Sequence, residues 1–404
     1  MNQKLKSLNP YPFEQLNSLL AGVTPASGFE FIALSMGEPK HPAPDFIVEQ
    51  YRQKASVMTG FGTYPPTKGI APLREAIASF VNRRFRLAAN PINPETQVLP
   101  VTGSREALFA IAQAVITSGA GSYTLMPNPF YQIYEGAALL AGSTPVFIPC
   151  TAATNYLPDF TVVTEEQWQQ CALLYLCTPG NPTGAVLPLA DMQALIRLSD
   201  KYDFVIASDE CYSEIYADEQ APPPGLLEAA CAMGRADYKN CIAFNSLSKR
   251  SNLPGLRSGY ACGDAAIMEA FLLYRTYHGS AMSVHNQWAS VAAWNDETHV
   301  LQNRISYRQK YAAVADILQD AWPMEQPTAG FYLWPQTPVS DEQFTQRLLE
   351  KANIKVLPGS YLSRQVAGSN PGQNRVRLAL VATLDECVVA AERLRHFMHN
   401  KAYE

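Results

Sequence analysis

The 404-residue chain lacks the sequence features that would place it in a membrane or outside the cell. No apolar run is long enough to span a bilayer, and the opening MNQKLKSLNPYPFEQL has no apolar core of a signal peptide. The formal net charge of −5 gives no net attraction to nucleic acid or anionic lipid. We therefore expect a cytoplasmic protein without a membrane or nucleic-acid partner.

The sequence also lacks closely paired cysteines. None of the eight cysteines forms a C-x-x-C pair, and most lie in apolar, strand-like runs. This spacing favours buried, reduced thiols over disulfides or zinc ligands, so we predict no metal site. The chain also has no internal repeat and no low-complexity tract.

The composition is that of a globular protein with a large core, since 47% of the residues are hydrophobic and 17% are charged. Short apolar runs alternate with helical patterns, which predicts an α/β fold with a mostly parallel sheet and helices on both faces. The expected strands are 98–101, 123–126, 145–148, 173–177, 204–207, 242–244 and 259–262.

After about residue 275 the pattern changes. A long helical region, 281–319, is expected to be kinked or broken, and short strands near 354–357 and 375–380 precede a closing helix. This order predicts a smaller α+β domain. We expect a large domain at residues 46–275 and a small domain built from residues 1–45 and 276–404.

Polar side chains follow several of the expected strands at the point where each strand ends. In open α/β sheets, ligands bind beyond the carboxyl ends of the strands, so these side chains should gather at one edge. The set near these ends contains Ser104, Tyr131, Asn181, Asp209, Tyr212, Ser246, Lys249 and Arg257. Such a concentration of polar groups indicates a binding site.

Some of these residues suit a phosphate and an aldehyde. Ser104 at a helix start, with free backbone N–H groups, is a candidate anion site. Ser246 and Arg257 bracket Lys249 and could hold the same phosphate, the arginine as a bidentate donor. Lysine is the residue type that forms imines with carbonyl groups when its pKa is lowered.

The other residues suit an aromatic ring. Asp209 could pair with a protonated ring nitrogen, and Asn181 and Tyr212 could donate to a phenolic oxygen. Tyr131 could stack on the ring. Phosphate, aldehyde, pyridinium and phenolate together describe pyridoxal phosphate.

At these residues the sequence resembles a known family. The stretch 246–259, SLSKRSNLPGLRSG, is similar to the S-x-S-K…G-x-R-x-G signature of class I/II aminotransferases, which are fold-type I pyridoxal-phosphate enzymes. Further motifs appear in the family's order, and the resemblance runs from about Leu34 to the C-terminus. They are Tyr64-x-x-x-x-Gly69, Asn181-Pro182-Thr183-Gly184, Asp209-Glu210-x-Tyr212 and Val376-Arg377-Leu378.

The resemblance implies roles around the ring and the reacting carbon. Lys249 forms a Schiff base with the cofactor and, once substrate displaces it, moves a proton between the substrate α-carbon and the cofactor. Asp209 keeps the ring nitrogen protonated, and Asn181 and Tyr212 hold the ring oxygen.

The resemblance also implies how the charged ends are held. The phosphate is bound by Ser104, the Arg105 backbone, Ser246 and Arg257, and Tyr64 reaches the phosphate of the neighbouring subunit in a homodimer. The substrate α-carboxylate is held by Arg377 with help from the backbone of Gly37.

Simpler readings exist for several of these residues. Asp209 alone could be a helix N-cap, and Tyr131 could belong to a core aromatic cluster with Phe130 and Tyr134. Arg375 competes with Arg377, because it lies two residues earlier on the same expected strand face. We prefer Arg377 on family register.

Within the family, four segments are similar to N-succinyldiaminopimelate aminotransferases of bacterial lysine biosynthesis. We therefore expect the substrates N-succinyl-LL-2,6-diaminopimelate and 2-oxoglutarate, with an aspartate- or alanine-type aminotransferase and a C–S β-lyase as alternatives. A non-catalytic relative of the fold is disfavoured because Lys249 and Asp209 are both present. The segments are 34–42 (LSMGEPKHP), 64–69 (YPPTKG), 274–279 (YRTYHG) and 377–382 (RLALVA).

A succinylated substrate carries more than one carboxylate, so cationic groups besides Arg377 are needed. The sequence does not rank the candidates, and each one alone is better explained as a solvated surface charge. The candidates in or near the expected edge loops are Lys40, Lys68, Arg105, Arg250 and Arg275.

Overall fold

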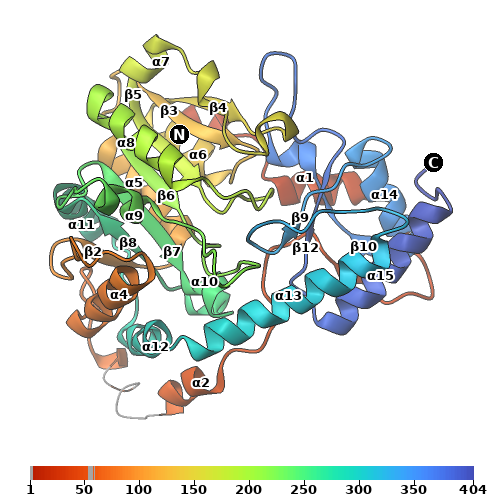
Figure 1. The fold of residues 1–404 in the computed structure, drawn as a ribbon, viewed down its shortest axis with the longest axis horizontal. Coiled ribbons are helices and arrows are strands. Elements are labelled where there is room, and N and C mark those ends of the chain that lie inside the picture. Colours follow the sequence, from red (N-terminus) through yellow and green to blue (C-terminus); the bar gives the residue numbers. More distant parts are fainter. Residues whose placement is uncertain (1–2, 53–57, 59) are drawn as a thin grey trace.

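The structure, a computed structural model, describes residues 3–52, 58 and 60–404. Its largest sheet has seven strands in the order β2-β8-β7-β6-β5-β3-β4 (Figure 1). Strand β8 runs antiparallel to β2 and β7, and the other neighbouring pairs are parallel. The predicted α/β sheet is therefore confirmed. Its strands are β2 (Val98–Val101), β3 (Tyr123–Asn128), β4 (Thr144–Pro149), β5 (Cys171–Cys177), β6 (Val205–Asp209), β7 (Cys241–Ser246) and β8 (Gly259–Gly263).

Helices cover both faces of this sheet, because successive side chains of each strand enter different hydrophobic clusters. In β7, Ala243 faces one cluster and Ile242 and Phe244 face the other. The first cluster includes residues of α4 (Ala71–Arg84), α8 (Leu189–Tyr202), α9 (Leu226–Ala232) and α12 (Val284–Asn295). The second includes residues of α5 (Ser104–Val115), α6 (Ile133–Ala141) and α11 (Ala265–His278).

A second, smaller layer is built from the end of the chain and part of its beginning (Figure 1). Antiparallel strands lie in the order β11-β12-β9, and β1 pairs in parallel with β10. Residues 32–34 thus pack with the C-terminal third of the chain. The elements are β1 (Ile32–Ala33), β9 (Tyr332–Leu333), β10 (Ile354–Lys355), β11 (Leu357–Pro358), β12 (Val376–Ala379), α1 (Pro12–Leu20), α13 (Thr298–Leu318), α14 (Asp341–Ala352) and α15 (Leu384–His399).

The long helical region is broken, as the pattern indicated. Helix α12 ends at Asn295, Asp296 adopts an extended conformation, and α13 begins at Thr298. Helix α12 packs against α4 in the core of the large sheet, whereas α13 runs from near α10 (Leu247–Arg250) toward α15 (Figure 1). The domain boundary at residue 275 stays a prediction.

Three short helices complete the described elements that flank these layers: α2 (Asp45–Arg52), α7 (Glu165–Gln169) and α10. Ile47 of α2 and Trp168 of α7 are buried in the first cluster of the large sheet. None of the helices in the described part of the chain is long and apolar enough to cross a bilayer.

Candidate active site

A cavity of about 410 Å³ lies where the two layers meet, and residues of both layers line it. Its volume is in the range of small-molecule sites. All of the predicted site residues except Tyr64 line this cavity, although they come from distant parts of the sequence. They are Gly37, Ser104, Arg105, Tyr131, Asn181, Asp209, Tyr212, Ser246, Lys249, Arg257 and Arg377.

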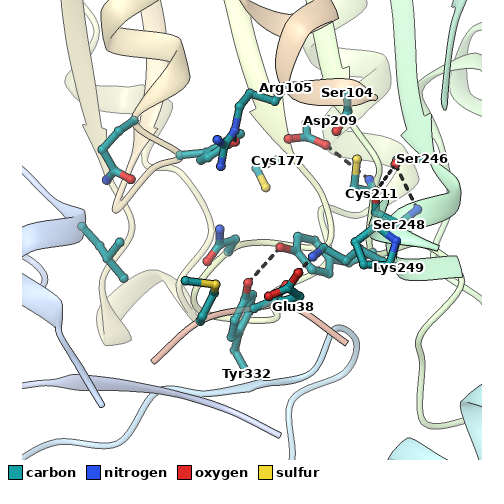
Figure 2. Close-up of a pocket in the computed structure, with 18 of the residues that line it drawn as sticks. Glu38, Ser104, Arg105, Cys177, Asp209, Cys211, Ser246, Ser248, Lys249 and Tyr332 are labelled. Atoms are coloured by element: carbon teal, nitrogen blue, oxygen red, sulfur yellow. Dashed lines mark hydrogen bonds between the residues drawn. The ribbon is translucent and has the colours of Figure 1, made fainter. Parts of the chain in front are cut away.

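Lys249 projects into the cavity from α10, the one-turn helix that directly follows β7 (Figure 2). Ser246 caps the start of this helix, because its Oγ accepts a hydrogen bond from the Ser248 N–H at 3.1 Å. The Lys249 Nζ donates to the carbonyl of Gly37 and lies 5.4 Å from the centre of the Phe331 ring. Burial lowers the pKa of Lys249 to about 8, so a neutral, nucleophilic amine is accessible near physiological pH.

Asp209 at the end of β6 is a buried carboxylate, only 4% exposed. Its Oδ2 accepts a hydrogen bond from the Tyr134 hydroxyl at 2.7 Å, and its Oδ1 accepts one from the Cys211 N–H at 3.3 Å. Burial raises the pKa of Asp209 because both donors are neutral and desolvation outweighs them. A cationic ring nitrogen placed beside this carboxylate would compensate its charge.

The start of α5 is suited to bind an anion. Gly103 precedes the helix with φ of 94°, so the first backbone N–H groups of α5 point out uncapped by a side chain. A Cβ at Gly103 would collide with the Arg257 guanidinium, which explains why glycine stands there. Arg257 itself has φ of 53°, a left-handed conformation that costs energy for a bulky residue and is typical of functional sites.

Arg377 on β12 is 4% exposed and lies over the Tyr332 ring, 4.4 Å from its centre. Its Nη1 donates to Asn181 Oδ1 at 3.0 Å, and its Nη2 donates to the Ser35 carbonyl at 2.7 Å. Its Nε is buried and has no hydrogen-bond partner among the described residues. A buried donor without a partner is costly, so this guanidinium is suited to receive an anion.

Arg375, the alternative carboxylate clamp, is directed elsewhere. Its Nη1 donates to the Trp334 carbonyl at 2.8 Å, and its guanidinium lies 5.1 Å from the centre of the Tyr156 ring. Arg375 does not line the described cavity, whereas Arg377 does. The geometry favours the arginine that family register selected.

The lower side of the cavity in Figure 2 carries Tyr332 and Glu38. The Tyr332 hydroxyl lies 3.0 Å from that of Tyr212, and both side chains are buried. Gly37 packs so closely on Tyr332 that a Cβ there would meet the Tyr332 hydroxyl. These contacts fix the position of the loop that contains Gly37, whose carbonyl accepts the hydrogen bond from the Lys249 amine.

The sequence did not single out several residues of this site. Tyr134, considered only as a core aromatic, holds Asp209 and stacks on Tyr175 at 4.5 Å. Tyr11, just before α1, enters the cavity from the other end of the chain. Neither belongs to a local motif, and nothing in the sequence around α1 indicated that Tyr11 would reach the cavity.

Among the candidate cations for a distal carboxylate, Arg105 is the one that lines the described cavity. Its Nε donates to the Tyr131 hydroxyl at 2.5 Å, and its guanidinium lies 5.9 Å from the centre of the Tyr11 ring. Arg250 and Arg275 are buried and paired with Glu297 and Glu106, and Lys68 is paired with Glu95. Lys40 is exposed outside the cavity lining.

Tyr64, the residue expected to reach a neighbouring subunit, does not line the described cavity. Its side chain is 98% exposed. An exposed tyrosine of this kind is available to a second protomer, but its role stays a prediction.

Comparison with known proteins gives the family. The model of the family described as "Aminotransferase class I and II" matches residues 30–394. The chain belongs to this family, whose members are pyridoxal-phosphate enzymes of fold-type I, and its cofactor is pyridoxal phosphate.

Individual relatives agree with this assignment over almost their whole length. An aminotransferase from Neisseria meningitidis Z2491 of known structure is 45% identical, with a TM-score of 0.93 over 98% of this chain and 100% of that one. An LL-diaminopimelate aminotransferase from Desulforudis audaxviator is 30% identical over 97% of this chain and 96% of its own. A putative aminotransferase, AatC, from Rhizobium meliloti is 32% identical over 98% and 95%.

The residues of the cavity fit this cofactor. The uncapped start of α5 with Arg257 suits a phosphate, and the buried carboxylate of Asp209 suits a pyridinium nitrogen. The lowered pKa of Lys249 suits bonding to an aldehyde carbon. The phosphate, the ring nitrogen and the aldehyde of pyridoxal phosphate thus each have a complementary group in one cavity.

Proposed function

We propose that this aminotransferase acts on long amino dicarboxylates, with N-succinyl-LL-2,6-diaminopimelate and 2-oxoglutarate as its substrate pair. The observation that carries the proposal is the presence of two guanidinium groups in the cavity, Arg377 and Arg105, besides the Arg257 assigned to phosphate. Two such groups can hold two substrate carboxylates at once. The sequence segments similar to N-succinyldiaminopimelate aminotransferases favour the succinylated substrate.

Pyridoxal phosphate, when bound, supplies an aldehyde that condenses with amines and a pyridinium ring that withdraws electrons from the substrate α-carbon. We propose that Lys249 moves the proton at that carbon with its neutral amine. Its lowered pKa, about 8, supports this role, because a lysine with an ordinary pKa would be almost wholly protonated near neutral pH.

The other side chains orient the reactants. Asp209 keeps a proton on the ring nitrogen, and its own position is held by Tyr134. Asn181 and Tyr212 donate to the ring oxygen; since the Asn181 oxygen already accepts from Arg377, its amide nitrogen is the group left to donate. The proposed phosphate ligands are Ser104, the Arg105 backbone, Ser246 and Arg257, and Tyr131 stacks on the ring.

Arg377 binds the substrate α-carboxylate, with the Gly37 backbone beside it. Arg105 binds the distal carboxylate, which in 2-oxoglutarate and glutamate is the γ-carboxylate. Tyr11 and Tyr131 flank the Arg105 guanidinium and limit its movement. Because the site has a second cation for a distal carboxylate, it discriminates against alanine, which has only one carboxylate; of the three carboxylates of N-succinyl-LL-2,6-diaminopimelate, Arg377 and Arg105 bind two.

A second substrate has a specific observation in its favour. Relatives that are about 30% identical over nearly the whole chain are named LL-diaminopimelate aminotransferases. Free LL-diaminopimelate carries two carboxylates, lacks the succinyl carboxylate and keeps the distal ammonium that the succinyl group masks. Both candidates belong to lysine and diaminopimelate biosynthesis.

A substrate panel tests the proposal. Purified protein with glutamate is expected to convert N-succinyl-2-amino-6-oxopimelate, and the product is measured by mass spectrometry. Faster reaction of free LL-diaminopimelate with 2-oxoglutarate would select the second candidate. Good activity on aspartate or alanine with no turnover of either pimelate would reject both, and release of pyruvate and ammonia from cystathionine would indicate a β-lyase.

We also propose a homodimer in which Tyr64 of each protomer binds the phosphate held by the other. The full exposure of Tyr64 supports this arrangement. Replacing Tyr64 with Phe should weaken cofactor binding roughly tenfold, by about 1.5 kcal/mol for one lost hydrogen bond to a charged group, without changing the mass in sedimentation. A monomeric wild type, or unchanged cofactor affinity, would exclude the shared site.

A further inference from the structure

The helix that carries Lys249 depends on contacts with other parts of the protein for its position. Helix α10 has four residues, and a single turn is unstable without tertiary contacts. Ser246 satisfies its first turn, as described above. At its other end, Asn303 of α13 donates its side-chain amide to the carbonyls of Lys249 at 3.1 Å and Arg250 at 3.3 Å. Asn303 is only 4% exposed, so these bonds are shielded from water.

The partners of Asn303 determine which group donates and which accepts in a series of hydrogen bonds that continues through His41 to Lys310. Since its amide nitrogen faces two carbonyls, its Oδ1 must accept; Asn252 Nδ2 donates to it at 3.0 Å, and His41 Nδ1 lies 3.1 Å from it. His41 Nδ1 therefore carries the proton. In a neutral ring the Nε2 then accepts, and the Lys310 ammonium, 2.5 Å away, donates to it.

Lys310, which begins this series of hydrogen bonds, is an unusual residue to find buried. It is 1% exposed, and its hydrogen-bond acceptors are the neutral His41 ring and the Leu380 carbonyl at 3.2 Å. Burying an ammonium among neutral acceptors is costly. Burial accordingly lowers the pKa of Lys310 to about 8. Leu380 directly follows β12, the strand of Arg377.

His41 also belongs to a segment that contacts the side chain of Lys249. Four residues before it, the Gly37 carbonyl accepts a hydrogen bond from Lys249 Nζ. The segment 37–41 therefore contacts the tip of Lys249 directly and its backbone carbonyl through Asn303. His41 thus links the backbone of Lys249, through Asn303, to the loop that contains the Gly37 carbonyl.

We propose that His41, held by Lys310 and bonded to Asn303, is a positioning residue for Lys249. It fixes the Lys249 peptide relative to the Gly37 loop, so that the amine reaches the α-carbon proton in a reactive geometry. The inference rests on the role proposed above for Lys249. Misplacing a catalytic group by about 1 Å can slow a reaction roughly a hundredfold, which is the effect that His41 prevents.

Four variants of the full-length, cofactor-loaded protein test this role. His41→Ala removes both hydrogen bonds, whereas His41→Asn keeps a donor near the position of Nδ1. Asn303→Asp has the same volume but places a carboxylate against the carbonyls of Lys249 and Arg250. Asn82→Ala is the matched control, because Asn82 bonds both backbone groups of Ile92 outside the cavity lining.

Two measurements are made on each variant: hydrogen–deuterium exchange of a peptide covering 246–253, and the rate of the glutamate half-reaction as a function of glutamate concentration. For His41→Ala and Asn303→Asp we expect roughly tenfold faster exchange and a saturating rate roughly 10- to 100-fold lower. The half-saturating glutamate concentration should change less than about twofold, because Arg377 and Arg105 are untouched. His41→Asn should stay within about threefold of wild type in both measurements.

The outcomes separate this inference from the proposed function. If Lys249 is not catalytic, the wild type itself shows no glutamate half-reaction. If only the role of His41 is wrong, the wild type reacts and His41→Ala matches it in exchange and rate. An equal loss in Asn82→Ala would also overturn the inference, since that loss would reflect general destabilisation. If His41→Ala does not fold, a wild-type-like Asn303→Asp would overturn the inference, because His41 acts on Lys249 through Asn303.

Discussion

Replacing Arg377 with Lys tests the substrate end of the site. Two of its N–H donors are used on Asn181 and Ser35, which leaves the others, Nε among them, for a carboxylate. A lysine keeps the charge but loses the planar fork, so one of two charged hydrogen bonds disappears. Each is worth about 1.5–3 kcal/mol, which corresponds to a loss in kcat/KM of roughly 10- to 150-fold.

The assay is the glutamate half-reaction, followed by the visible absorbance of the cofactor. Arg375→Lys is the matched control, since that guanidinium bonds the Trp334 carbonyl outside the cavity lining. A second comparison uses 4-aminobutyrate, which lacks the α-carboxylate; wild type and Arg377→Lys should process this slow substrate at similar rates. The reasoning is refuted if Arg377→Lys reacts with glutamate as wild type does, or if Arg375→Lys loses as much.

Three further predictions concern single side chains. Arg105→Gln should lower kcat/KM for glutamate roughly tenfold or more while sparing alanine, and Lys68→Gln should change neither; equal effects on both substrates would remove Arg105 from the distal site. Asp209→Asn should bind cofactor but turn over roughly 100- to 1000-fold more slowly, and wild-type kcat would contradict its electrostatic role. Lys310 releases its proton near pH 8 when folded and near 10.4 when unfolded, so between these values the unfolded state binds more protons and stability rises with pH. Relative to Lys310→Met, wild type should thus gain up to about 3 kcal/mol from pH 8 to 10.4 in urea unfolding, and a constant difference would show that Lys310 is not desolvated.

The fold was largely predictable because its signals are local. Except for the edge strand β4, the strands of the large sheet are largely buried on both faces and therefore appear in the sequence as short apolar runs. The run 242–244, for example, became β7 (Cys241–Ser246). The cofactor-site candidates were found for a related reason: they directly follow those strands, where chain order alone brings them to one edge.

Other parts of the site depend on packing that no local pattern encodes. Arg375 and Arg377 share a strand face by simple alternation, but β12 begins at Val376, so Arg375 precedes the strand and turns to Trp334. Tyr11 reaches the cavity because α1 packs near β11, far along the chain. The His41–Asn303–Lys310 chain likewise joins segments more than 250 residues apart, since 262 residues separate His41 from Asn303.

The most direct test of the account is to locate the bound cofactor before and after transamination. Borohydride reduction of the resting enzyme, followed by peptide mass spectrometry, should find the pyridoxyl group on Lys249. After excess glutamate and removal of 2-oxoglutarate, the same treatment should leave Lys249 unmodified. A pyridoxyl group on another lysine, or a Lys249 adduct that glutamate does not remove, would contradict the assignment of Lys249 as the catalytic residue of an aminotransferase.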